Sequence, residues 1–183
     1  MNRLAHTVPF GYEPPPENRK GTMVVYDTFQ HLEDEALAFA AATAERRGFA
    51  KLVLYPLHEE TVRRMTKEPV LPYHARLDRL RGWKRGYEEE RGRGAVAVAV
   101  EGLEGKRKKY TPMDAALRHL AEAYPSPLFL YLTPETANQF ASYASFEEWI
   151  VKLRLLLSEE PHSPHPKLAR YAHRWDVAER TQR

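Results

Sequence analysis

Residues 23–56 of this 183-residue chain have the pattern of a strand, a helix and a second strand. This pattern restricts the possible folds more than any other feature of the sequence. Residues 23–26 (MVVY) are a continuous apolar run, which is typical of a parallel strand buried on both faces. Mainly apolar residues then recur at spacings of three and four, which predicts a helix with one buried face. These residues are Leu32, Ala36, Phe39, Ala40 and Thr43. Gly48 supplies a left-handed helix stop, and residues 51–55 before Pro56 predict the second strand. The spacing fits a right-handed crossover between parallel strands.

The alternation of strands and helices continues along the chain. Residues 95–100 and 128–132 predict two further strands, because they are short apolar runs rich in valine and leucine. The predicted helices lie at residues 59–67, 73–84, 133–140 and 168–180, with others starting near 111 and 145 and a polar loop at 88–94. Four pairs of residues are helix-start signals. They are Asp27 with Gln30, Thr111 with Pro112, Thr133 with Pro134, and Ser145 with Glu148. This order predicts an α/β fold with a Rossmann-like, mostly parallel sheet flanked by helices.

The length of the chain suits one folded domain. Residues 1–21 are predicted to be a proline-rich N-terminal arm, because Pro14, Pro15 and Pro16 oppose a regular helix. The α/β domain is expected at residues 22–160. Residues 161–183 are expected to form a loop and a C-terminal basic helix packed on that domain.

Composition excludes several kinds of site. The chain has no cysteine, so it has no disulfide, thiolate nucleophile or cysteine-based zinc site. No apolar run approaches the roughly 18–20 residues of a membrane span, so we expect a cytoplasmic protein without a membrane partner. We expect no cofactor and no metal, since the acidic residues after Asp27 suit a helix start and His162 and His165 lack further ligands. Homo-oligomer formation is left open.

The charge is distributed unevenly. Residues 27–60 hold seven acidic and three basic residues, whereas residues 63–109 hold fourteen basic and seven acidic residues. Two interpretations of the basic part stay open. It is a solvated surface, or it is a nucleic-acid-binding segment at residues 76–109 in which Trp83 or Tyr87 stacks on a base.

Three stretches of the sequence resemble one enzyme family. VVYDTFQHLEDEAL, YTPMDAALRHLAEAYPSPLFLYL and TPETANQFASYASFEEWI are similar, in this order, to segments of the nicotinate-nucleotide adenylyltransferases, members of the nucleotidyltransferase superfamily. The resemblance covers about residues 23–157, with Thr28 and Phe29 matching the family's Thr-Phe pair. It implies a nucleotidyltransferase-like parallel sheet and a nucleotide, or another anionic small molecule, as ligand.

The chain departs from this family at the phosphate-binding positions. In the register of the resemblance, the tandem glycines fall on Tyr26 and Asp27, and the two histidines fall on Glu33 and Ala36. The family's aspartate falls on Gln30, and its C-terminal phosphate motif has no counterpart. Because the family transfers adenylyl groups by placing positive charge around phosphate, these changes predict that the activity is lost and that at most ligand binding remains.

The predicted site lies at the C-terminal ends of the strands, where open α/β sheets bind ligands. We expect it to contain no catalytic residue and to be lined by six residues. They are Asp27, Thr28, His31, His58, Thr133 and Glu135. An alternative is an active nucleotidyltransferase in which His31, His58 or Arg76 has taken over the phosphate role.

Overall fold

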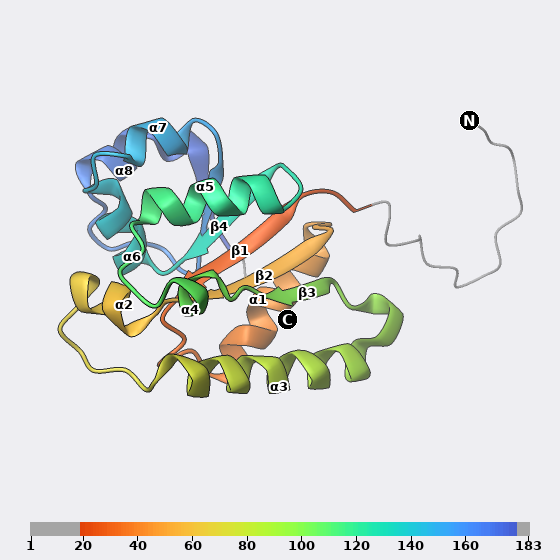
Figure 1. Ribbon diagram of the computed structural model, residues 1–183. Coiled ribbons are helices and arrows are strands. Elements are labelled where there is room, and N and C mark those ends of the chain that lie inside the picture. Colours follow the sequence, from red (N-terminus) through yellow and green to blue (C-terminus); the bar gives the residue numbers. More distant parts are fainter. Residues whose placement is uncertain (1–18, 179–183) are drawn as a thin grey trace, which may run out of the picture.

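The fold is built on a six-stranded parallel β-sheet (Figure 1). The computed structural model describes residues 19–178. The strands are β1 (Thr22–Asp27), β2 (Lys51–Pro56), β3 (Ala97–Val100), β4 (Leu128–Leu132), β5 (Arg154–Leu157) and β6 (Trp175–Val177). Their order across the sheet is β3-β2-β1-β4-β5-β6, and every neighbouring pair is parallel. This order is that of a doubly wound Rossmann-like sheet, so the predicted fold class is confirmed.

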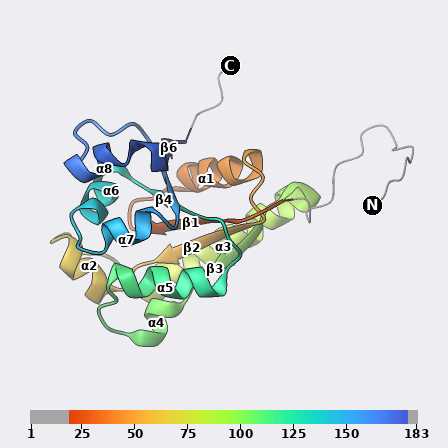
Figure 2. The same cartoon turned by 90° about the horizontal axis from the view of Figure 1, so that it is seen from above.

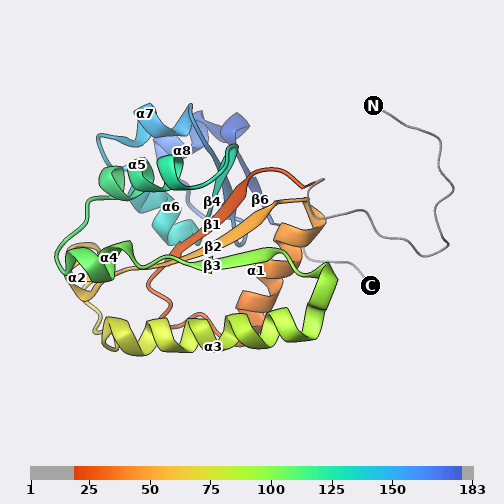
Figure 3. The same ribbon diagram turned by 45° about the vertical axis from the view of Figure 1, so that its right-hand side comes forward.

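Helices cover both faces of the sheet (Figures 1 and 3). They are α1 (Asp34–Arg46), α2 (Glu59–Met65), α3 (Tyr73–Arg91), α4 (Leu103–Arg107), α5 (Met113–Ala123), α6 (Pro134–Ala141), α7 (Phe146–Ile150) and α8 (Pro166–Arg170). One face packs against α1 and α3, and the opposite face packs against α5, α6, α7 and α8. Among residues 19–178, no helix is both long and apolar enough to cross a membrane.

Strand β1 is central to the core because it is buried on both faces. Val24 and Tyr26 pack with the helices of the α5 face, whereas Met23 and Val25 pack with those of the α1 face. Successive side chains of a strand point to opposite faces, so a strand buried on both faces needs a continuous apolar run. The run at residues 23–26 therefore forms the strand that was predicted there.

The chain reverses its direction of travel across the sheet at β1. From β1 it passes through β2 to β3 at one edge, and it then returns to β4 on the other side of β1. A crevice opens at such a switch point, beside the C-terminal ends of the two strands. Helices α2 and α6 lie at this end of the sheet (Figure 2), and the Gln139 side chain of α6 donates to the Met65 carbonyl of α2 at 3.1 Å.

Two of the local signals in the sequence work as predicted. Gly48 has a φ of 76° just after α1, a conformation that favours glycine. The Thr133 hydroxyl caps α6 by accepting from the Thr136 amide at 3.2 Å, and Pro134 occupies the first turn.

The other helix-start predictions are wrong in detail. Helix α1 begins after Glu33, so Asp27 does not cap it, and α5 begins after Pro112 rather than Thr111. The Thr111 amide instead donates to the Thr61 hydroxyl at 3.0 Å. The Ser145 side chain makes no capping bond to α7. For Asp27 a different turn, and for Thr111 a tertiary contact, replaces the local hydrogen bond that the sequence suggested.

The predicted loop at residues 88–94 is wrong, because α3 continues to Arg91 and a 3-10 turn follows at Gly92–Gly94. This last part of α3 is attached to α1. The Arg91 guanidinium lies 2.8 Å from Glu45, and Tyr87 also donates to Glu45. Contacts with a neighbouring helix thus extend a segment whose own composition is that of a loop.

The predicted C-terminal helix at residues 168–180 is also wrong. The chain there forms α8, a 3-10 turn at Ala172–Arg174 and strand β6. Strand β5 before it was not predicted, because its sequence RLLL is a short apolar run that suits a helix equally well. Pairing of β6 with β5 decides the outcome. Most of the predicted proline-rich arm, including Pro14, Pro15 and Pro16, lies outside the described residues.

Candidate ligand-binding cleft

A cleft with two lobes lies at the C-terminal ends of β1 and β4. The larger lobe, of about 630 Å³, lies between the loop after β1, the end of α2 and the start of α6; we call it the α2 lobe. The smaller lobe, of about 230 Å³, lies between α1 and the ends of β1, β4 and β5; we call it the β5 lobe. Asp27, Leu32 and Thr133 belong to the walls of both lobes. The cleft therefore occupies the switch point of the sheet.

Five of the six predicted site residues meet in this cleft. The α2 lobe is lined by Asp27, Thr28, His31, Thr133 and Glu135. The sixth, His58, lines neither lobe. Its Nδ1 atom caps α2 by accepting from the Glu60 amide at 3.1 Å, and its ring lies against Tyr73 at 5.7 Å between centroids.

Asp27 is held at the junction of the lobes by a tight turn. Its Oδ1 accepts the Phe29 amide at 2.7 Å and the Thr28 hydroxyl at 3.5 Å. Burial raises the pKa of the Asp27 carboxyl, and the hydrogen bonds from Phe29 and Thr28 oppose that rise. Phe29 is buried and has a φ of 61°, a conformation that is strained for a residue with a bulky side chain. The turn therefore fixes a partly buried acid beside the cavity.

The cleft is acidic. Its walls include Asp27, Glu68 and Glu135 in the α2 lobe and Glu159 in the β5 lobe. His31 is the basic residue of these walls, and its Nε2 lies 3.6 Å from Glu68 Oε1, with both side chains mostly exposed. The start of α1 adds Asp34 and Glu35 in its first turn. Carboxylates thus dominate the charge in and around the cleft.

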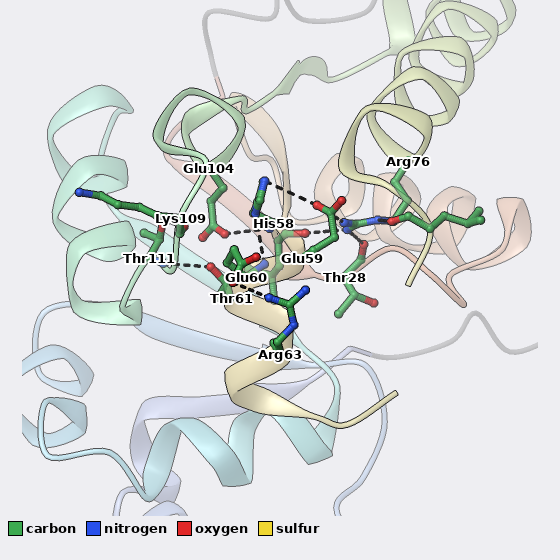
Figure 4. Close-up of polar contacts among 12 residues, drawn as sticks. Thr28, His58, Glu59, Glu60, Thr61, Arg63, Arg76, Glu104, Lys109 and Thr111 are labelled. Atoms are coloured by element: carbon green, nitrogen blue, oxygen red, sulfur yellow. Dashed lines mark hydrogen bonds and ion pairs between the residues drawn. The ribbon is translucent and has the colours of Figure 1, made fainter. Parts of the chain in front are cut away.

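Arg76 is the most buried cation near the cleft, and it contacts the backbone of three separate segments (Figure 4). Its Nη1 donates to the carbonyls of Thr28, at 2.7 Å, and Leu57, at 2.6 Å. Its Nε donates to the Leu71 carbonyl at 2.8 Å. Its Nη2 lies 3.7 Å from Glu59 Oε1, and neither atom has a hydrogen-bond partner among the described residues. Arg76 lines neither lobe, and its contacts give it a structural role at this end of the sheet.

A buried acid supports the same end of β2. Glu104 of α4 is fully buried and accepts the Tyr55 hydroxyl at 2.6 Å. It also accepts the His58 amide at 2.9 Å (Figure 4). Burial raises the pKa of Glu104, and the hydrogen bonds from Tyr55 and the His58 amide oppose the rise. The carboxylate therefore connects α4 to the segment that enters α2.

The sequence reasoning missed four residues that matter here: Arg76 as a buried group, Glu104, Ser158 and Glu159. Arg76 carried a signal, because it stands with Tyr73, Leu77 and Leu80 on the helix face that the apolar spacing buries. Glu104 lies in a polar, glycine-containing segment, and nothing in that sequence indicates that it is buried. Ser158 and Glu159 follow β5, and they could not be placed without that strand.

The aromatic residues proposed for nucleic-acid binding are engaged within the protein. Trp83 and Tyr87 stack on each other, with 5.1 Å between ring centroids, and both pack against the core of the α1 face. Arg79 and Arg91 lie beside acids of α1, Asp34 and Glu45. These contacts engage the two rings proposed to stack on a base and two of the basic side chains of residues 76–109.

No protein-family model matches this chain, and no curated protein matches its sequence. The resemblance to nicotinate-nucleotide adenylyltransferases therefore stays an expectation. In the described part of the chain, no group of three or more histidine, aspartate or glutamate side chains is arranged to hold a metal ion.

Replacing Arg76 should destabilise the fold strongly. Arg76→Leu leaves three backbone carbonyls without their donor, so we expect a loss of about 3–5 kcal/mol in the free energy of unfolding, measured by urea denaturation. The matched control is Arg79→Leu on the same helix. Arg79 forms an ion pair with exposed Asp34, and its loss should cost about 0–1 kcal/mol. Equal, small losses in both variants would contradict the structural role of Arg76.

Replacing Asp27 with asparagine should stabilise the protein at pH 7. The variant keeps an oxygen that accepts the Phe29 amide and removes a carboxylate that burial disfavours. Because the folded-state pKa of Asp27 is raised, the wild type loses stability as pH rises from the unfolded value near 3.8 through the folded value. The melting temperatures of Asp27→Asn and the wild type should therefore separate as pH rises over that range. Glu35→Gln, an exposed control, should give no stabilisation, and a less stable Asp27→Asn at pH 7 would contradict the expectation.

Proposed function

We propose that this protein binds a small organic molecule in the cleft between β1 and β4 and does not transfer adenylyl groups. The observation that carries the proposal is a cavity at the switch point of a Rossmann-like sheet, with acidic residues where a nucleotidyltransferase is positive. The position supports binding, and the charge argues against catalysis on a triphosphate.

The lining of the β5 lobe supports binding of an organic ligand. Its apolar wall is formed by Val25, Leu32, Ala36, Phe39 and Tyr131. Asp27, Thr133 and Ser158 add polar groups at the strand ends. Small-molecule sites commonly combine a mostly apolar wall with a few polar groups that fix the ligand's orientation.

The alternative of an active nucleotidyltransferase receives no support from the three residues it invokes. The Arg76 guanidinium donates to backbone carbonyls, and His58 caps α2 outside the cleft. His31 is in the cleft but lies beside Glu68, so its positive charge would be opposed there. A triphosphate would then face several carboxylates and a single histidine.

The first test is an assay for adenylyl transfer. Purified protein incubated with ATP, magnesium and nicotinate mononucleotide should release no pyrophosphate above the level of a protein-free control. Turnover that is abolished in His31→Ala would overturn the proposal and support the active-enzyme alternative.

The second test asks whether the β5 lobe accepts an organic ligand. The probe is 2-phenylethanol, an uncharged molecule with one ring. It is added at millimolar concentrations, and its binding is monitored by NMR spectra of the protein. It should shift the amide signals of Ala36, Thr133 and Ser158 in a saturable manner. Ala36→Trp fills the lobe and should abolish these shifts, whereas Ala38→Trp, on the exposed side of the same helix, should retain them.

Both tryptophan variants should unfold cooperatively. A variant that does so is still folded, so a loss of binding in it is due to the filled lobe and not to unfolding of the protein. Shifts that persist in Ala36→Trp would place the probe elsewhere and contradict the proposed site. The absence of saturable shifts in the wild type would contradict binding in this lobe.

A further inference from the structure

The charge of the cleft restricts the ligands it can hold. Four carboxylates line the two lobes, and His31 is the basic side chain among their described lining residues. An anionic ligand would be repelled by these carboxylates, whereas a cation would be attracted. The acidic residues alone do not define a ligand, so the argument also needs the shape and polarity of the space beside them.

That space is a mostly apolar cavity with two acids in its wall, Asp27 and the exposed Glu159. The β5 lobe has a volume of about 230 Å³, and Asp27 stands in its wall beside Val25, Phe39 and Tyr131. A cavity of about 150 Å³ accommodates benzene, so this lobe is large enough for one ring with a short chain. A ligand that fills it would have an apolar body with a polar group near Asp27.

Within residues 19–178, Asp27 forms no ion pair with a lysine, arginine or histidine. Burial raises its pKa, and the more distant His31 lowers that pKa slightly against the effect of burial. Its Oδ1 is positioned by the Phe29 amide, so the carboxylate is held in place while its charge stays unpaired. A charge that is partly buried and unpaired is stabilised when a ligand brings the opposite charge.

An organic cation suits these walls better than a metal ion. A hard metal ion takes several oxygen ligands, and the described residues contain no group of three or more candidate ligands arranged to hold one. An ammonium group needs only a few acceptors, and Asp27, Thr133 and Ser158 offer oxygen atoms around one lobe.

We propose that the ligand of the cleft is an organic amine, with its protonated amino group at Asp27 and a single ring-sized apolar group in the β5 lobe. This inference rests on the proposed function and names the chemical class that the same site binds. It also gives Asp27 a specific role, since its carboxylate selects for the positive charge of the ligand.

The test compares three probes that share a phenyl ring and differ in the group that reaches Asp27: 2-phenylethylamine, 2-phenylethanol and phenylacetate. Affinities are measured at pH 7 from the amide shifts of Ala36, Thr133 and Ser158. The amine should bind about tenfold more tightly than the alcohol, because a charge-assisted hydrogen bond replaces a neutral one. Phenylacetate should bind most weakly.

Two variants decide whether Asp27 causes the preference. Asp27→Asn should bind the amine and the alcohol with nearly equal affinity, and its binding of the alcohol shows that the lobe is intact. Glu35→Gln removes an exposed carboxylate of α1 that lines neither lobe, and it should keep the preference for the amine.

The outcomes separate this inference from the proposed function. If the alcohol binds in the β5 lobe and the amine binds no better, the amine assignment is wrong and the proposed function stands. A preference for the amine that persists in Asp27→Asn also overturns the assignment. If none of the three probes shifts the lining amides, both the assignment and binding in this lobe are overturned.

Discussion

The buried guanidinium of Arg76 is the contact on which the end of the sheet depends. Chain segments that leave parallel strands carry carbonyl groups that the sheet does not pair, and burial without a donor is unfavourable. Arg76 supplies donors to three such carbonyls, after β1, after β2 and before α3. Since Thr28 and Leu57 also line the α2 lobe, one side chain of α3 sets the position of two walls of the cleft. These contacts use the Nε and Nη1 atoms of Arg76 within the protein, and its Nη2 atom lies beside Glu59.

The acids near the cleft have two different roles. Glu104 is fully buried and receives hydrogen bonds from Tyr55 and the His58 amide, so it holds α4 against the end of β2. Asp27 is fixed by its own turn and faces the cavity, where burial raises its pKa and no ion pair among the described residues offsets the effect. A group that destabilises the folded protein and lies at a cavity is typical of a binding site, because a ligand can then supply the missing interaction.

The meeting of residues at the strand ends was easier to predict than the edges of the sheet. Asp27 and Thr133 come together because they follow β1 and β4, which are neighbours whose C-terminal ends meet at the switch point. His58 also follows a strand, but β2 lies on the far side of β1 from β4, and its side chain caps α2 instead. Strands β5 and β6 were not predicted. Their sequences, RLLL and WDV, are too short to show the alternation of apolar residues that distinguishes a strand from a helix.

The sequence by itself determined the α/β class and the buried central strand. These properties are local, because they depend on apolar runs, cap residues and residue identity. Only the tertiary structure decided which backbone carbonyls Arg76 contacts and that carboxylates from distant segments share one cleft. Arg76 and Thr28 are 48 residues apart, and Glu159 reaches the site only because β5 pairs with β4. Such contacts depend on how strands and helices pack, and no local pattern of residues encodes them.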